Sequence, residues 1–160
     1  MIRIVGRLLI SRAATIAIDL VVMVLMALSL YELLREFAVL PGRSDAKEII
    51  TDVSVIMIGW GVALEERGSV RDVFGIRGGS DDAWQDRIDH ASHGVGVLLL
   101  LFGLFAEIFE QLVTLPRSVI STEPFHDVLL AIATLFVAGG LIVLGRHVVM
   151  LALMKKHRGD

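Results

Sequence analysis

Long apolar runs separated by short charged segments are the main pattern along this chain. Four such runs lie at about residues 13–34, 49–64, 94–115 and 128–154. An α-helix rises about 1.5 Å per residue, so roughly 20 residues cross the hydrocarbon core of a bilayer. The second run is near the lower limit for crossing, and the other three are long enough. The pattern predicts an all-α integral membrane protein, an up-down bundle of four transmembrane helices.

Basic residues are distributed unequally between the segments that flank the four runs. One side carries ten of them: Arg3, Arg7, Arg12, Arg67, Arg71, Arg77, Arg87, Lys155, Lys156 and Arg158. The other side carries four: Arg35, Arg43, Lys47 and Arg117. Cytoplasmic loops are enriched in Lys and Arg, so the N and C termini are both expected in the cytoplasm. We therefore expect a multi-pass protein of the cell inner (plasma) membrane.

The third helix is expected to extend into the cytoplasm. Ser80, followed by Asp81 and Asp82, supplies a capping hydroxyl and acidic groups suited to a helix start. Residues 80–92 mix apolar and charged side chains, which is typical of an amphipathic segment at a membrane interface or a partner surface. The chain, 1–160, is expected to form a single transmembrane domain.

Small residues spaced by four occur in every run, and such pairs let helix backbones approach closely in a membrane. The pairs are Ala13 and Ala17, Gly59 and Ala63, Ser92 and Gly96, and Thr134 and Ala138. They favour a compact bundle in which the first helix neighbours the second and the fourth.

Composition agrees with a membrane protein and argues against several classes of function. Hydrophobic residues make up 55% of the chain, and the mean hydropathy is +0.74, above what a water-soluble domain of this size requires. A net charge of −3 gives no basic surface for nucleic acid. The absence of cysteine excludes disulfides and thiolate metal sites. No Gly-x-Ser-x-Gly, His-Glu-x-x-His or phosphate-binding glycine loop is present, so we expect neither an enzyme nor a bound cofactor.

Two ionisable residues lie at similar depth in the first and fourth runs. Asp19 follows Arg12 by seven residues, about 10 Å along a helix, and Arg146 precedes Lys155 by nine. Charges in hydrocarbon are costly and are usually paired inside the bundle. The spacing predicts an intramembrane ion pair between Asp19 and Arg146 that clasps the two helices. A proton-relay role is the alternative interpretation.

Two histidines lie near the same side of the membrane. His93 begins the apolar part of the third helix, and His147 lies in the fourth. Imidazole nitrogens are axial ligands of haem, and nearby glycines could leave room for the macrocycle. A haem held between His93 and His147 is therefore a further alternative, beside ordinary hydrogen-bonding roles for both.

Carboxylates from several helices gather toward the extracytoplasmic side. Asp52, Glu107, Glu110 and His126 form a candidate proton or cation site, since Glu107 and Glu110 are three residues apart on one helical face. The simpler interpretation is a water-facing rim. Glu107 is the exception, because it lies about 20 Å along the helix from Gly94 and is expected within the bilayer.

One short segment resembles a known family. Residues 61–72, GVALEERGSVRD after Trp60, resemble the small membrane subunit of tripartite ATP-independent periplasmic transporters, whose second helix is followed by a basic cytoplasmic turn. This chain lacks the aromatic and paired-acid motif expected before that helix, where residues 44–50 read SDAKEII. No residue role carries over from the family.

These patterns favour a non-enzymatic accessory or scaffold subunit that works by helix-helix association with itself or with a larger membrane complex. Its expected partners are the lipid bilayer and either a homo-oligomer or that complex. An oligomeric channel or transporter for a proton or cation, using intramembrane carboxylates, is the second hypothesis. A membrane cytochrome is the third.

Overall fold

The computed structural model describes residues 11–39, 44–74, 82–114 and 125–154, and these ranges are almost entirely α-helical. The helices are α2 (Arg12–Val39), α3 (Ser44–Glu65), α4 (Arg67–Val73), α5 (Asp82–Thr114) and α6 (His126–Leu153). The prediction of an all-α protein is confirmed. The short helix α4 was not predicted. Ser80, the expected cap of the third helix, lies outside the described residues, and α5 begins at Asp82.

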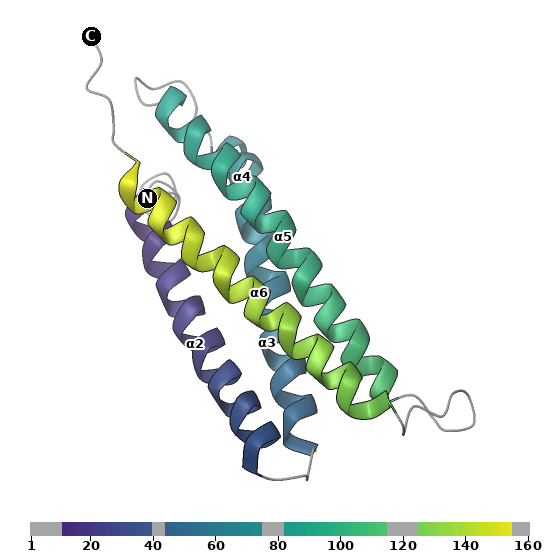
Figure 1. Ribbon diagram of the computed structural model, residues 1–160. Helices are drawn as coiled ribbons and strands as arrows, with labels where there is room; N and C mark the ends of the chain where they lie inside the picture. Colours follow the sequence, from purple (N-terminus) through teal and green to yellow (C-terminus); the bar gives the residue numbers. More distant parts are fainter. Residues whose placement is uncertain (1–10, 40–43, 75–81, 115–124, 155–160) are drawn as a thin grey trace.

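The four long helices alternate in direction along the bundle (Figure 1). The start of α2, the end of α6 and helix α4 share one end, which we call the α4 end. A hydrogen bond from Arg12 Nη2 to the carbonyl oxygen of Ala152, at 2.7 Å, joins the first turn of α2 to the last turn of α6. Residues distant in sequence therefore meet at the α4 end.

Within the described ranges, three helices are long and apolar enough to cross a membrane: α2 over Arg12–Phe37, α5 over Ala83–Val113 and α6 over His126–Leu153. They support a membrane protein. Helix α3 has 22 residues, but every stretch of 18 within it contains at least three charged side chains. Because of these charges, α3 is less apolar than the other three long helices. A fourth membrane span through α3 stays a prediction.

Apolar side chains from α2, α3, α5 and α6 form one continuous core. Members with no exposed surface include Met26 and Leu33 of α2, Ile50 and Met57 of α3, Leu99 of α5, and Leu130, Val137 and Leu144 of α6. A membrane bundle needs close packing because lipid solvates leucine as well as another leucine does. The buried faces therefore fix how each helix is rotated.

Glycines bring α3 and α5 into backbone contact. A Cβ atom built on Gly61 would lie 2.7 Å from the backbone nitrogen of Leu100 and 2.8 Å from the carbonyl oxygen of Gly96. A Cβ on Gly96 would collide in turn with the backbone of Gly61 and Glu65. Only residues without a side chain permit this approach. This glycine contact sets the spacing of α3 and α5 next to the site described below.

Candidate functional site: a buried polar cluster

Four side chains form a polar cluster within the bundle, and each comes from a different long helix. They are Asp19 of α2, Trp60 of α3, Ser92 of α5 and His147 of α6. Asp19, Ser92 and His147 have no exposed surface, and Trp60 is half-buried. We call these four residues the buried polar cluster. It is the point at which all four long helices share polar contacts.

The cluster is a chain of contacts that runs through Asp19 and His147. Trp60 Nε1 donates a hydrogen bond to Asp19 Oδ1 at 2.8 Å. His147 Nδ1 lies 2.9 Å from Asp19 Oδ2. His147 Nε2 lies 3.2 Å from Ser92 Oγ. Asp19 Oδ2 and His147 Nδ1 are both buried, and neither forms a hydrogen bond with any described residue. Their 2.9 Å approach is therefore the polar contact that each atom has, and it is an ion pair when His147 is protonated.

These contacts indicate how protons are arranged on the imidazole. A neutral histidine donates from one ring nitrogen and accepts at the other. The carboxylate at Nδ1 favours a proton there, and Nε2 then accepts from the Ser92 hydroxyl. If both nitrogens carry protons, the hydroxyl turns and accepts from Nε2 instead. The cluster can therefore hold either form of His147.

Helical rise places Asp19 and His147 at the same depth. Asp19 follows the first residue of α2, Arg12, by seven positions, and His147 precedes the last residue of α6, Leu153, by six. At about 1.5 Å per residue, both lie roughly 10 Å from the α4 end. Since α2 and α6 run in opposite directions (Figure 1), these equal distances bring the two side chains together.

The order of contacts matches that of a Ser-His-Asp triad, in which the hydroxyl meets one imidazole nitrogen and the carboxylate the other. Two features weigh against acyl transfer. Ser92 has no exposed surface, and it lies within α5, whose backbone N–H groups are used by the helix. Hydrolases need free donors aimed at the oxyanion. The cluster is therefore suited to holding helices together or sharing a proton.

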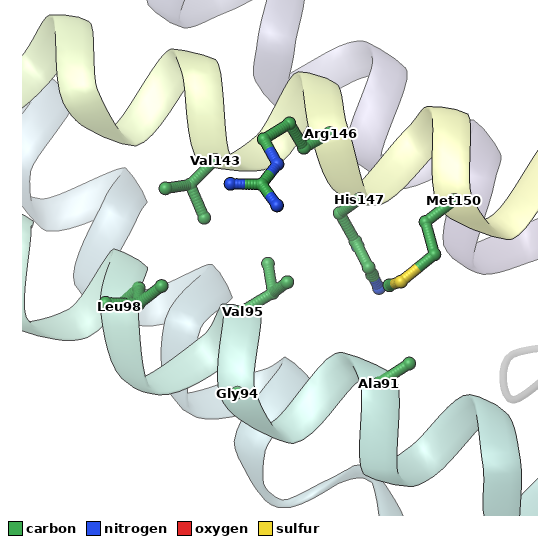
Figure 2. Close-up of a pocket in the computed structure, with 8 residues that line it drawn as sticks. All are labelled: Ala91, Gly94, Val95, Leu98, Val143, Arg146, His147 and Met150. Carbon is green, nitrogen blue, oxygen red and sulfur yellow. The ribbon is translucent and has the colours of Figure 1, made fainter.

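The predicted partner of Asp19 was Arg146, but the structure places the neighbouring residue, His147, against Asp19. Consecutive residues are about 100° apart around a helix, so Arg146 faces a different direction. Its side chain is exposed and borders a cavity between α5 and α6 (Figure 2). None of the residues that the structure describes forms a hydrogen bond or ion pair with Arg146.

The two candidate haem ligands are not arranged to share a group. His93 is exposed, and its Nδ1 lies 3.5 Å from the carbonyl oxygen of Glu65. His147 faces Asp19 and Ser92 with its two ring nitrogens. An axial ligand must direct a free nitrogen at the iron. In this arrangement the residues present do not fit a haem between His93 and His147.

The candidate cation residues lie toward the opposite end of the bundle. Glu110 is 4% exposed, near Lys47 and Thr51 of α3, and Glu107 accepts a hydrogen bond from Gln111 Nε2 at 2.9 Å. Asp52 is exposed and borders a separate groove between α2 and α3. His126 is half-buried at the start of α6. Among the described residues, no three His, Asp or Glu side chains converge as a metal site.

A second polar network, which the sequence did not predict, joins α4 to α5. Arg67 Nη1 and Arg71 Nη1 each lie 2.6 Å from one carboxylate oxygen of Asp89, and Arg71 Nη2 lies 2.7 Å from Asp86 Oδ1. Arg71 is only 1% exposed. Burial lowers the pKa of the Arg67 guanidinium from its ordinary value, and Asp89 opposes that shift. The spacing of the two arginines by four residues was the available signal.

Comparisons with known proteins add no assignment to this geometry. No protein-family model matches the chain, and neither the curated proteins nor the solved structures include a significant match.

Proposed function

We propose that this protein is a non-enzymatic integral membrane subunit that works by helix-helix association with itself or with a larger membrane complex. One observation carries the proposal: the buried polar cluster uses polar side chains from all four long helices within one copy, which leaves their exposed apolar faces for partners. Polar groups in hydrocarbon join helices because the alternative is an unsatisfied group in lipid. The cluster thus acts as a clasp within one copy of the chain.

The outward faces of the helices are what remains for partners. On α2, the exposed apolar side chains include Leu20, Val21, Val24, Leu25 and Leu28. Such faces contact lipid or another membrane helix. The described residues include no water-soluble domain that could act apart from the bundle. Association through helix faces is therefore the activity that this architecture favours.

We propose in addition that α3 is a fourth span and that both termini are cytoplasmic. Its charged residues Lys47, Glu48 and Asp52 lie in its first turns, away from the α4 end, and 17 residues from Ile49 to Glu65 include only two charges. The remainder of α3 packs among the other helices, where its buried residues meet protein. The excess of Lys and Arg supports the cytoplasmic assignment and an inner-membrane location.

Labelling of single cysteines tests this topology. A cysteine-reactive, membrane-impermeant reagent should fail to label single cysteines at residues 2 and 159 in intact cells and should label one at residue 42. The chain contains no natural cysteine, so each reading is unambiguous. Labelling of residue 2 or residue 159 from outside would overturn the proposed orientation.

A second candidate function is a subunit that moves a proton or cation. The Asp19 and His147 pair favours it, because buried ionisable residues in membrane segments often carry protons. Glu107 and Glu110 supply carboxylates toward the opposite end. Between the two groups lies an apolar core in which Gly140 packs against the methyl groups of Met57 and Met26. Transport requires this core to open.

Two measurements on one preparation separate the candidates. Native mass spectrometry after mild-detergent extraction should show the chain in a complex of defined stoichiometry, and proton flux in reconstituted vesicles should equal that of empty vesicles. Glu107→Gln should leave the complex intact, as should the matched control Glu48→Gln at an exposed site. A monomer would overturn the first proposal. A flux that Glu107→Gln abolishes and Glu48→Gln preserves would overturn it in favour of the second.

A further inference from the structure

An arginine that pairs with no residue in the described part of the chain borders a cavity between α5 and α6. The cavity has a volume of about 470 Å³, and it is open to the outside between the two helices. Apolar side chains line most of it, among them Val95, Leu98 and Val143, and Gly94 leaves space in its wall. His147 reaches the same cavity from the buried polar cluster. The charged group at this cavity is the Arg146 guanidinium.

Arg146 points along the cavity. Figure 2 shows its side chain reaching back beside Val143, over the space between α6 and α5. Side chains on a helix tilt toward its N-terminus, so the guanidinium of Arg146 turns away from the nearer end of α6. No described residue pairs with it. A cation among apolar groups in a bilayer is costly unless an anion accompanies it.

The depth of Arg146 suits a lipid headgroup. Arg146 precedes the last residue of α6, Leu153, by seven positions, which is about 10 Å along the helix axis. The side chain turns toward the N-terminus of α6, so the guanidinium lies deeper than the Cα atom of Arg146, and a phosphate that pairs with it must enter the cavity from the α4 end. Val95, Leu98 and Val143 form an apolar wall that continues toward the middle of the bundle. An acyl chain that extends from the headgroup could lie along this wall.

We propose that this cavity binds an anionic phospholipid, whose phosphate pairs with Arg146 and whose acyl chain lies along Val95, Leu98 and Val143. The guanidinium forms two parallel hydrogen bonds to phosphate, which lysine does not reproduce. Basic pockets between membrane helices on the cytoplasmic side are suited to acidic headgroups. This inference needs the chain to lie in a membrane and does not depend on whether it acts as a scaffold or a transporter.

Native mass spectrometry of the full chain in mild detergent tests the site. Phosphatidylglycerol and phosphatidylcholine with identical acyl chains are added separately, and retained lipid is counted. We expect phosphatidylglycerol to bind about tenfold more tightly than phosphatidylcholine, which corresponds to about 1.4 kcal/mol. Arg146→Gln should abolish this preference, and Arg146→Lys should restore part of it. Arg87→Gln removes an equal charge from an exposed site on α5 and should change nothing.

A second variant keeps Arg146 and fills the cavity. Gly94→Leu should weaken phosphatidylglycerol binding about tenfold. The matched control is Gly59→Leu, because a Cβ at either glycine meets no atom within 4 Å and both changes are expected to fold. Equal lipid retention by wild type and Gly94→Leu would overturn the proposal, as would an unchanged headgroup preference in Arg146→Gln.

Inorganic phosphate separates a lipid site from a soluble-anion site. Millimolar phosphate should not displace bound phosphatidylglycerol, since it offers no acyl chain to the apolar wall. Displacement by inorganic phosphate, with equal retention of the two lipids, would assign the cavity to a soluble anion and overturn the lipid proposal.

Discussion

The Asp19 carboxylate of α2 and the His147 imidazole of α6 lie 2.9 Å apart, and neither side chain has any exposed surface. Removing one partner of a buried polar contact leaves the other group without compensation, which costs about 1–3 kcal/mol and more when that group is charged. We expect Asp19→Ala to lower the free energy of unfolding by about 3 kcal/mol. Equilibrium unfolding in mixed micelles measures it.

The control for this prediction is Asp52→Ala, which removes an exposed carboxylate from α3 and should change stability by less than about 0.5 kcal/mol. A double-mutant cycle of Asp19→Asn with His147→Gln should give a coupling free energy of at least about 1 kcal/mol. Additive effects of the two changes would mean that the contact contributes nothing.

Trp60 supplies the second hydrogen bond to Asp19, and Trp60→Phe removes the donor while keeping an aromatic ring. Asp19 Oδ1 would then be left without the 2.8 Å bond from Nε1. A buried acceptor without a partner costs about 1–3 kcal/mol, so we expect a loss of that size in the same unfolding assay. Trp84→Phe, in the first turn of α5, serves as the control and should have a smaller effect. Equal losses in both variants would rule out a specific role for the indole N–H.

The glycine contact between α3 and α5 predicts an unusual sensitivity to alanine. Gly61→Ala would place a methyl group 2.7 Å from the backbone nitrogen of Leu100, so the helices must separate. Overpacking of this kind costs about 1–3 kcal/mol. Gly59→Ala, two residues earlier, meets open space and should be neutral or slightly stabilising, because alanine favours helices. Thermal unfolding of both variants compares them, and a neutral Gly61→Ala would contradict the close approach.

Helix α4 is held by the arginine network and should be released when Asp89 loses its charge. Asp89 accepts from both Arg67 and Arg71, whereas Asp86 contacts Arg71 alone and is 63% exposed. Limited trypsin digestion in nanodiscs should cleave Asp89→Asn after these arginines several-fold faster than wild type. Asp86→Asn should show a smaller increase. Equal cleavage of the two variants would show that exposure, and not pairing, controls this site.

Apolar length was enough to find α2, α5 and α6, and depth was enough to place Asp19 near the last third of α6. The length of an apolar run and the depth of a residue do not determine how a helix is rotated about its axis. Arg146 and His147 differ by one residue, and the packing of neighbouring helices decides which of them faces Asp19. The positions of apolar runs therefore could not predict that His147 faces the inside of the bundle and Arg146 the outside.

Small residues gave partial information about packing. Ser92 and Gly96 are buried against the other helices, as their spacing suggested, whereas Gly59 and Ala63 face outward and Gly61 makes the contact instead. Spacing by four marks a face without showing which face meets a neighbour. Helix α4 was missed because seven residues are too few, and too polar, to show an apolar period.

The buried polar cluster also has a consequence for biosynthesis. Asp19 enters the bilayer with the first helix, Trp60 follows 41 residues later, and His147 arrives only with the last one. The nascent chain therefore carries a carboxyl group in lipid that has only part of its polar contacts until translation is almost complete. A chain truncated before α6 would keep the Trp60 hydrogen bond to Oδ1 but leave Oδ2 without His147, which makes Asp19 a built-in mark by which membrane quality control could distinguish unfinished chains from finished ones.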